Sequence, residues 1–427
     1  MICLGVTLLA AQNQPTLGRL DRERILYMLE KVSKEVRERY YDPTFHGVDI
    51  EARFREAENK IKAASSVSQA ITAIAVSLDY LEDSHTYFLP PPRNTRYSFG
   101  WRMQMVGDRC LITEVKPGSD AEAKGLAPGD EVLSIRNYAP SRQSLPKLSY
   151  YFEFLRPQPT LSLRVRNPGG EEQSREIGAR ITTLQQIMGV TLSDFLEPDR
   201  EAERVGNSRR PKYVELDQGI VVAKMPRFNL NAEGTYNLLR RLRKAKKVIL
   251  DLRGNSGGAE ESLVQLIGGM FEGEVMIGTL VSRKERKSLT ARGHGESSYS
   301  GEMIVLVDSQ TSSAAELFAR VVQIEKRGRV IGDISSGRVM RTRVFQSHVG
   351  VDIVTFFGAA ITESDLIMKD GQSLEGKGVT PDEVILPTPR ELRAHADPVL
   401  ARACAVFGIS VKPEVAGRWF PYEWLSN

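Results

Sequence analysis

The chain has 427 residues, and at about 150 residues per domain this length predicts two or three domains with at least one sizeable core. Its 58 lysines and arginines against 54 aspartates and glutamates leave a net charge of +4, too slight for a nucleic-acid-binding face. A hydrophobic fraction of 41% with 26% charged residues is typical of a soluble globular protein. Cys3, Cys110 and Cys404 lie too far apart in sequence to indicate a zinc site or a disulfide framework.

An apolar run at residues 2–11 ends in small residues just before Gln12 and has the length of a secretory h-region. It lacks the basic residues that precede such a region, and it is far shorter than the roughly 20 residues that span a bilayer. We therefore expect no integral membrane span. Residues 1–14 read either as a truncated signal peptide, which predicts a periplasmic or secreted protein, or as a frayed N-terminus.

Residues 15–92 are expected to form a helical N-terminal region. Apolar residues recur at three- and four-residue spacing between positions 25 and 36, after a candidate N-cap at Asp21. The same pattern predicts a helix that begins after Asp49 and another that begins at Ser66 or Ser68. Three consecutive prolines at 90–92 end the last helix and begin an extended linker.

The sequence pattern changes at residues 95–180, where short strand-like runs alternate with turns. A strand at 110–115, a short helix at 121–126, a Pro-Gly-Asp turn and a strand at 131–135 follow one another. This order resembles a PDZ domain of the bacterial protease type. The resemblance implies a domain that captures peptide C-termini.

In such domains the end of a peptide adds as an edge strand and a backbone loop holds its carboxylate. Here that loop is expected at Phe99, Gly100 and Trp101. The alternative is that Phe99 and Trp101 are simply buried aromatic residues.

Residues 181–212 read as an amphipathic connector with a polar, arginine-rich end. From residue 213 to about 390, apolar runs alternate with helical patterns, which predicts βα units in an α/β core. Residues 391–427 form a C-terminal extension. The predicted fold class is therefore a multidomain α/β (α+β) protein.

Two strand–turn–helix segments of this core can carry chemistry. The first runs from residue 248 into a turn that contains Gly254, Gly257 and Gly258, where backbone N–H groups can point at one anionic atom. The spacing of these glycines fits neither a dinucleotide fingerprint nor a Walker motif. An oxyanion site is the better functional interpretation, and a structural tight turn is the alternative.

The second segment leads from an apolar run at 304–307 to Ser313, at the start of a helix. The positive end of that helix can stabilise negative charge that develops on a serine. Ser313 and Glu316 also have the spacing of a capping box, which needs no catalysis.

These two segments, taken together with the PDZ-like region, indicate a particular protein family more specifically than either segment alone. A PDZ-like region, then the glycine-rich turn, then Thr-Ser-Ser-Ala-Ala-Glu at 311–316 resembles the C-terminal processing or tail-specific serine peptidases and their relative, the tricorn core. The resemblance extends from residues 40–47 to residues 378–382. It implies a crotonase- or ClpP-like α/β peptidase core, and neither a metal nor an organic cofactor.

By this resemblance the nucleophile is Ser313. The processing peptidases carry a lysine 25 residues later and a glutamine four residues beyond it, and this chain has Arg338 and Thr342 there. An arginine does not lose its proton at any working pH, so it does not act as a general base. The Ser–Lys dyad is therefore absent from this chain.

The tricorn-like branch instead places a histidine base on an early Ser-His pair and a glutamate near the end of the core. The matching residues here are Ser84, His85 and Glu375. By resemblance, His85 takes the proton of Ser313 while Glu375 and Ser84 orient the imidazole. The alternatives are a structural histidine, a turn-capping Ser84 and an exposed loop carboxylate at Glu375.

The oxyanion hole expected from the resemblance consists of backbone N–H groups of the Gly257-Gly258 turn and of Ala314. The resulting prediction is a PDZ-containing serine endopeptidase that binds unstructured polypeptide C-termini and cleaves them through an acyl-enzyme on Ser313. The rival is an inactive PDZ scaffold on a peptidase fold. Acyl-CoA chemistry on a crotonase-like core is a third interpretation, supported only by the glycine-rich turn. The sequence predicts no particular oligomeric state.

Overall fold

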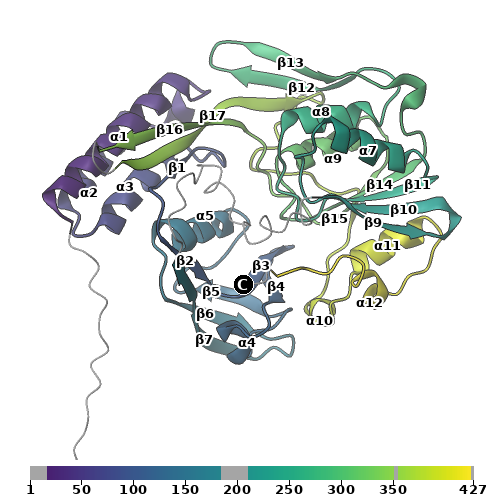
Figure 1. Ribbon diagram of the computed structural model, residues 1–427, viewed down its shortest axis with the longest axis horizontal. Helices are drawn as coiled ribbons and strands as arrows, with labels where there is room; N and C mark the ends of the chain where they lie inside the picture. Colours follow the sequence, from purple (N-terminus) through teal and green to yellow (C-terminus); the bar gives the residue numbers. More distant parts are fainter. Residues whose placement is uncertain (1–16, 184–209, 351–353, 425–427) are drawn as a thin grey trace, which may run out of the picture.

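The computed structural model describes residues 17–183, 210–350 and 354–424 (Figure 1). The signal-peptide prediction at residues 1–14 and most of the predicted connector, residues 184–209, lie outside the described residues. None of the helices in the described part of the chain has the length and apolar composition needed to cross a membrane.

The N-terminal region consists of three helices, α1 (Arg19–Arg39), α2 (Ile50–Ala63) and α3 (Val67–Asp79). The side chains of Asp49 and Ser66 accept hydrogen bonds from the first turns of α2 and α3, as their sequences predict. Helix α1 begins two residues before Asp21, with Gly18 at its N-cap. The helices share one hydrophobic core with Phe357 and Ile361 of the long strand β17, so the region is packed onto a sheet (Figure 1).

A separate antiparallel sheet follows. Its order is β3 (Trp101–Val106), β4 (Arg109–Val115), β5 (Glu131–Ile135), β6 (Thr160–Arg166) and β7 (Glu172–Gly178), with β3 at one edge. Helices α4 (Asp120–Ala123) and α5 (Ser144–Tyr150) accompany this sheet, which has its own hydrophobic core. The chain enters through β2 (Thr95–Ser98) and leaves through β8 (Arg180–Thr183), and these two strands pair with each other. We call this unit the β3–β7 domain.

The central sheet has six strands, in the order β18 (Glu383–Val384), β15 (Arg329–Gly332), β14 (Glu302–Val307), β11 (Lys247–Asp251), β10 (Ile220–Lys224) and β9 (Lys212–Leu216). All neighbouring pairs are parallel except β9 and β10. The nearly continuous apolar runs of β11 and β14 suit strands buried on both faces.

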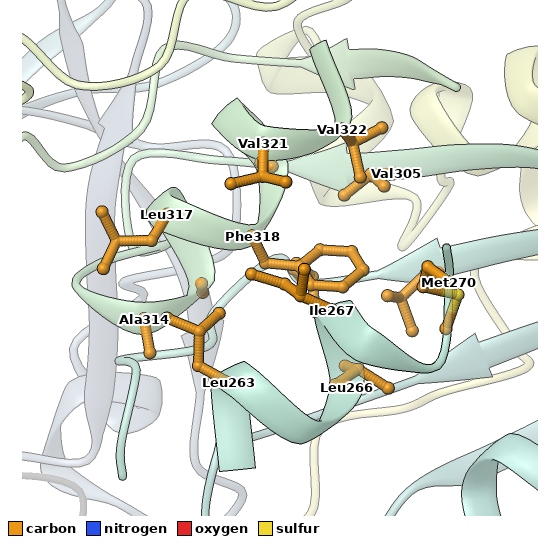
Figure 2. Close-up of a cluster of buried hydrophobic side chains, with 14 of the residues drawn as sticks. Leu263, Leu266, Ile267, Met270, Val305, Ala314, Leu317, Phe318, Val321 and Val322 are labelled. Carbon is orange, nitrogen blue, oxygen red and sulfur yellow. The ribbon is translucent and has the colours of Figure 1, made fainter. Parts of the chain in front are cut away.

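Helices cover both faces of this sheet. One face packs against α7 (Ala232–Leu242), α8 (Glu260–Gly268) and α9 (Ala314–Ile324). Figure 2 shows Leu263 and Ile267 of α8 packed around Phe318 of α9. The other face packs against the C-terminal helices α11 (Pro398–Val406) and α12 (Pro413–Ala416), which follow α10 (Pro389–Arg393). The predicted mixed α/β fold is confirmed.

A second sheet joins the helical region to the core. It contains β1 (Tyr87–Leu89), β12 (Val275–Ser282), β13 (Arg286–Ala291), β16 (Arg341–Val349) and β17 (Thr355–Met368). The first part of β17 pairs with β16 and β1, and its last part pairs with β12. Strand β17 therefore runs from the helical region to the core (Figure 1), and it lies between β16 and β1, which begins just after His85, because both pair with the same stretch of β17.

Candidate active site

The two strand–turn–helix segments meet at one edge of the central sheet. Strands β11 and β14 are parallel neighbours, so the turns that follow them leave at the same end. The N–H of Ser312 donates to the carbonyl oxygen of Asn255 at 2.9 Å. A methyl group on Gly257 would lie only 2.6 Å from Cβ of Ser313. The glycine-rich turn therefore contacts Ser313 so closely that no side chain fits at position 257.

Ser313 has an unusual backbone conformation, with φ of 54° and ψ of −124°, at the N-cap of α9. Such a conformation in a residue other than glycine costs about 1–3 kcal/mol and persists only where its surroundings enforce it. Here its N–H donates both to the carbonyl oxygen of Arg338, at 2.8 Å, and to Oε2 of Glu316, at 3.0 Å. The capping box expected from the sequence is therefore present, and it holds the serine at the positive end of a helix.

The amides expected for the oxyanion hole differ in their bonding. Gly257 donates its N–H to Oδ1 of Asn255 at 2.8 Å, so its contribution here is steric. Among the described residues, no acceptor is bonded to the N–H of Gly258 or of Ala314. A Cβ on Gly258 would meet the carbonyl oxygen of Phe228 at 2.2 Å. The turn therefore requires two glycines, and the N–H groups of Gly258 and Ala314 remain without an acceptor in the described part of the chain.

Glu316 is a buried residue that sequence reasoning treated only as a capping partner. Its Oε1 accepts hydrogen bonds from the hydroxyl of Ser335 (2.6 Å) and the N–H of Gly337 (2.7 Å). Its Oε2 accepts from the N–H of Arg338 at 3.0 Å, as well as from Ser313. Burial raises the pKa of Glu316 to about 7. One carboxylate thus holds the segment 335–338 against the start of α9.

A buried ion cluster lies at the start of the glycine-rich turn. The guanidinium of Arg253 binds Asp251 at 2.8 Å and Asp397, of the C-terminal extension, at 2.6 Å. Lys224 contacts Asp251 at 3.2 Å and donates to the carbonyl oxygen of Arg253. These cations hold the pKa of Asp251 well below its usual range despite the burial of its carboxyl group. The sequence offered one signal, an aspartate at the end of a buried strand and an arginine two residues later.

Ser84, His85 and Glu375 form a second cluster. The hydroxyl of Ser84 lies 2.7 Å from Nδ1 of His85. The N–H of Ser84 donates to Oε1 of Glu375 at 2.9 Å. Oε2 of Glu375 accepts from the N–H of Val339 at 2.8 Å. Burial raises the pKa of Glu375. The structure thus brings together three residues that the sequence could only associate by resemblance.

Arg338 connects this cluster to Ser313. Its guanidinium donates to the carbonyl oxygen of Ser84 at 3.0 Å, while its own carbonyl oxygen accepts from Ser313. Burial and, to a smaller extent, the charge of Arg338 together lower the pKa of His85 to about 3. In the described part of the chain no hydrogen bond joins His85 to Ser313 directly.

The residues expected to hold a peptide carboxylate lie at the start of edge strand β3. Phe99 and Trp101 are partly buried and stacked, with ring centroids 5.0 Å apart. Gly100 has a φ of +75°, and its carbonyl oxygen accepts from Lys116 at 2.8 Å. Farther along β3, the hydroxyl of Ser309 donates to the carbonyl oxygen of Met105. The edge of β3 therefore lies against the loop that leads to Ser313.

Comparisons with known proteins agree with this arrangement. Residues 219–385, which include the glycine-rich turn, Ser313 and Glu375, match Peptidase family S41. Over these residues the chain is similar to that family. It is therefore a serine-type peptidase, in line with the curated relatives that it resembles.

Two of these relatives illustrate the similarity. The peptidase is 25% identical over 333 residues to the carboxyl-terminal-processing protease of Synechocystis sp., covering 74% of this chain and 71% of the relative. It is 22% identical over 342 residues to a probable CtpA-like serine protease of Staphylococcus aureus, covering 77% and 62%. The crystal structure of mature CPAF shares the fold with a TM-score of 0.65 at 14% identity, over 88% of this chain and 94% of that one.

Proposed function

We propose that this peptidase hydrolyses polypeptides through an acyl-enzyme on Ser313, with His85 as the general base. The observation that supports this most is the hydrogen-bonded series from Glu375 through Ser84 to Nδ1 of His85, which Arg338 ties to Ser313. A nucleophile, a histidine and groups that orient the histidine are the parts that such catalysis needs. The lysine base of the processing peptidases has no counterpart in Arg338.

The hydrogen bonds favour one tautomer of His85. Both oxygens of Glu375 accept backbone N–H groups, as an ionised carboxylate does. We propose that the Ser84 hydroxyl directs its single proton toward Glu375, because a carboxylate only accepts and its Oε1 already binds the N–H of Ser84. The oxygen of Ser84 then accepts from Nδ1–H of His85. Nε2 is left with a free lone pair, which is the form that a general base requires.

In this mechanism Nε2 of His85 takes the hydroxyl proton of Ser313 while Oγ bonds to the peptide carbonyl carbon. The carbonyl π electrons move to the oxygen, and the N–H groups of Gly258 and Ala314 stabilise the oxyanion. As the carbonyl forms again, the C–N bond breaks and His85 gives its proton to the leaving amine. Water then attacks the acyl-enzyme by the same proton transfers and releases Ser313.

We propose that the β3–β7 domain binds an exposed, apolar C-terminus of an unstructured substrate. Two observations support this: β3 is an edge strand, and a glycine with positive φ stands just before it, as a carboxylate-binding loop requires. The peptide would pair with the start of β3, because the carbonyl oxygens of Met103 and Met105 already accept from Gln310 and Ser309. The proposed loop residues remain Phe99, Gly100 and Trp101. Export to the periplasm or the medium stays a prediction from residues 2–11.

The test is cleavage of an unstructured polypeptide that ends in apolar residues, compared among the wild type, Ser313→Ala, His85→Ala and His348→Ala. His348 lies exposed on β16 and is the matched control. We expect loss of turnover in the first two variants and full turnover in the third. Turnover that survives His85→Ala would remove the histidine base. A wild type that binds the polypeptide without cutting it would favour the inactive scaffold.

A further inference from the structure

The residue that replaces the lysine of the processing peptidases has a role of its own in this chain. We propose that Arg338 is a positioning residue that joins the base to the nucleophile and places a permanent positive charge beside His85. The inference deepens the proposed function and rests on it for the assignment of the base.

Three hydrogen bonds locate Arg338 between the two halves of the site. Its N–H donates to Glu316 at 3.0 Å, and its carbonyl oxygen accepts from the N–H of Ser313 at 2.8 Å. Its guanidinium donates to the carbonyl oxygen of Ser84 at 3.0 Å. The main chain of Arg338 is thus fixed to the start of α9, and its side chain holds the segment that carries His85.

The His85 segment reaches the core from the N-terminal helical region, about 230 residues before Ser313. Its other contacts with segment 335–349 are a hydrogen bond from the Thr342 hydroxyl to the carbonyl oxygen of His85, at 3.3 Å, and the shared carboxylate of Glu375. The bond from Arg338 carries a full charge on its donor, and charge-assisted hydrogen bonds are roughly twice as strong as neutral ones. Loss of this side chain should therefore loosen the base from the nucleophile.

The charge of Arg338 also acts on the imidazole. A nearby cation disfavours the imidazolium, in addition to the larger effect of burial. Within the described ranges, two carboxyls and a phenol also lie near His85. Asp83 accepts from the N–H of His85 at 2.7 Å, and Glu375 accepts from the N–H of Ser84. Burial raises the pKa of Tyr87, and the charge of Arg338 opposes that rise. Among these groups Arg338 is the permanent cation, so it keeps the base in its neutral form under acidic conditions.

The experiment is a pH titration of ¹⁵N-labelled histidine side chains by NMR in the full chain. The sequence has 5 histidines, and His85→Asn identifies the signal of His85. The variants are Arg338→Met, which removes both the charge and the donor, and Arg338→Gln, which removes the charge and keeps a donor. Arg343→Gln, at a side chain that is 62% exposed on β16, is the control.

We expect both Arg338 variants to raise the pH at which His85 protonates by about one unit or more, as the loss of one adjacent like charge does. The control should titrate as the wild type does. In peptide cleavage, kcat should fall more in Arg338→Met than in Arg338→Gln, with little change in KM, because only methionine lacks the donor to Ser84.

If His85 protonates at the same pH in Arg338→Gln as in the wild type, the inference is wrong. The NMR titration needs no turnover, so it reports on Arg338 even if the wild type cuts no polypeptide. If Arg338→Met does not fold, Arg338→Gln and its control give the same comparison. Failure of the proposed function instead appears as full turnover in His85→Ala.

Discussion

Gly257 and Ser313 lie so close that a Cβ on the glycine would stand 2.6 Å from the Cβ of the serine. The two residues come from different βα units, and their contact joins the glycine-rich turn to the proposed nucleophile. Gly257 has a φ of +90°, which favours glycine as well. The position is therefore restricted both by its own backbone and by its neighbour.

Gly257→Ala should reduce kcat/KM by about 100-fold or more, because the methyl group displaces Ser313 and misplacement by about 1 Å has effects of that size. Gly371→Ala is the matched control, with a φ of +82° and no atom within 4 Å of the added Cβ. It carries a similar backbone strain of about 1 kcal/mol without the clash. Steady-state cleavage rates and urea unfolding of both variants separate the two effects. Equal activity in both would show that the contact is unimportant.

Glu375→Gln and Ser84→Ala should each lower kcat by about 10²- to 10⁴-fold, the range found when an orienting partner of a catalytic histidine is lost. Each change breaks the series that favours the Nδ1–H tautomer. The ¹⁵N shifts of His85 measure the tautomer independently of turnover, and Nε2 should carry more of the proton in both variants. An unaltered tautomer with normal kcat would argue against the relay.

Glu316 should make stability fall with rising pH. Its folded-state pKa is raised to about 7 from a usual value of 4.5, so the folded state binds a proton that the unfolded state has lost. The unfolding free energy should therefore decrease between about pH 4.5 and pH 7, by a total on the order of 3 kcal/mol. Glu316→Gln should remove this decrease, whereas Glu261→Gln, at an exposed residue, should keep it. Urea unfolding at several pH values provides the measurement. Parallel pH curves for the wild type and Glu316→Gln would contradict the prediction.

Asp397→Asn should destabilise the fold by about 3 kcal/mol, because it leaves the buried guanidinium of Arg253 with only one carboxylate. The matched control is Glu215→Gln, which breaks an ion pair with Arg241 whose side chains are 45% and 65% exposed. That pair should contribute less than about 1 kcal/mol. Chemical denaturation measures the free energy of unfolding of the two variants. Equal decreases in this free energy would show that the ion cluster of Arg253 contributes little to stability.

Local patterns in the sequence predicted the features that depend on neighbouring residues. The caps at Asp49 and Ser66, the turn before α8 and the start of α9 follow from spacing and capping chemistry alone. The cluster around Glu316 could not be predicted in this way, because its donors other than Ser313 lie 19 to 22 residues away and include backbone groups that carry no side-chain signal.

The assembly of Ser84, His85 and Glu375 depends on contacts over an even longer range. Ser84 and Glu375 are 291 positions apart, and they meet only because β17 connects the helical region to the core. Their association came from resemblance to a family. The bond from Arg338 to Ser84 has no counterpart in any local pattern, so the structure was needed to find it.

The central claim is that His85 activates Ser313. The most direct measurement is the rate at which a fluorophosphonate labels Ser313, followed by intact mass and peptide mapping, in the wild type, His85→Ala and Ser313→Ala. We expect one adduct on Ser313 in the wild type, a rate about 10³-fold lower in His85→Ala, and no adduct in Ser313→Ala. Equal labelling rates in the wild type and His85→Ala, or a wild type that takes no label, would contradict the account.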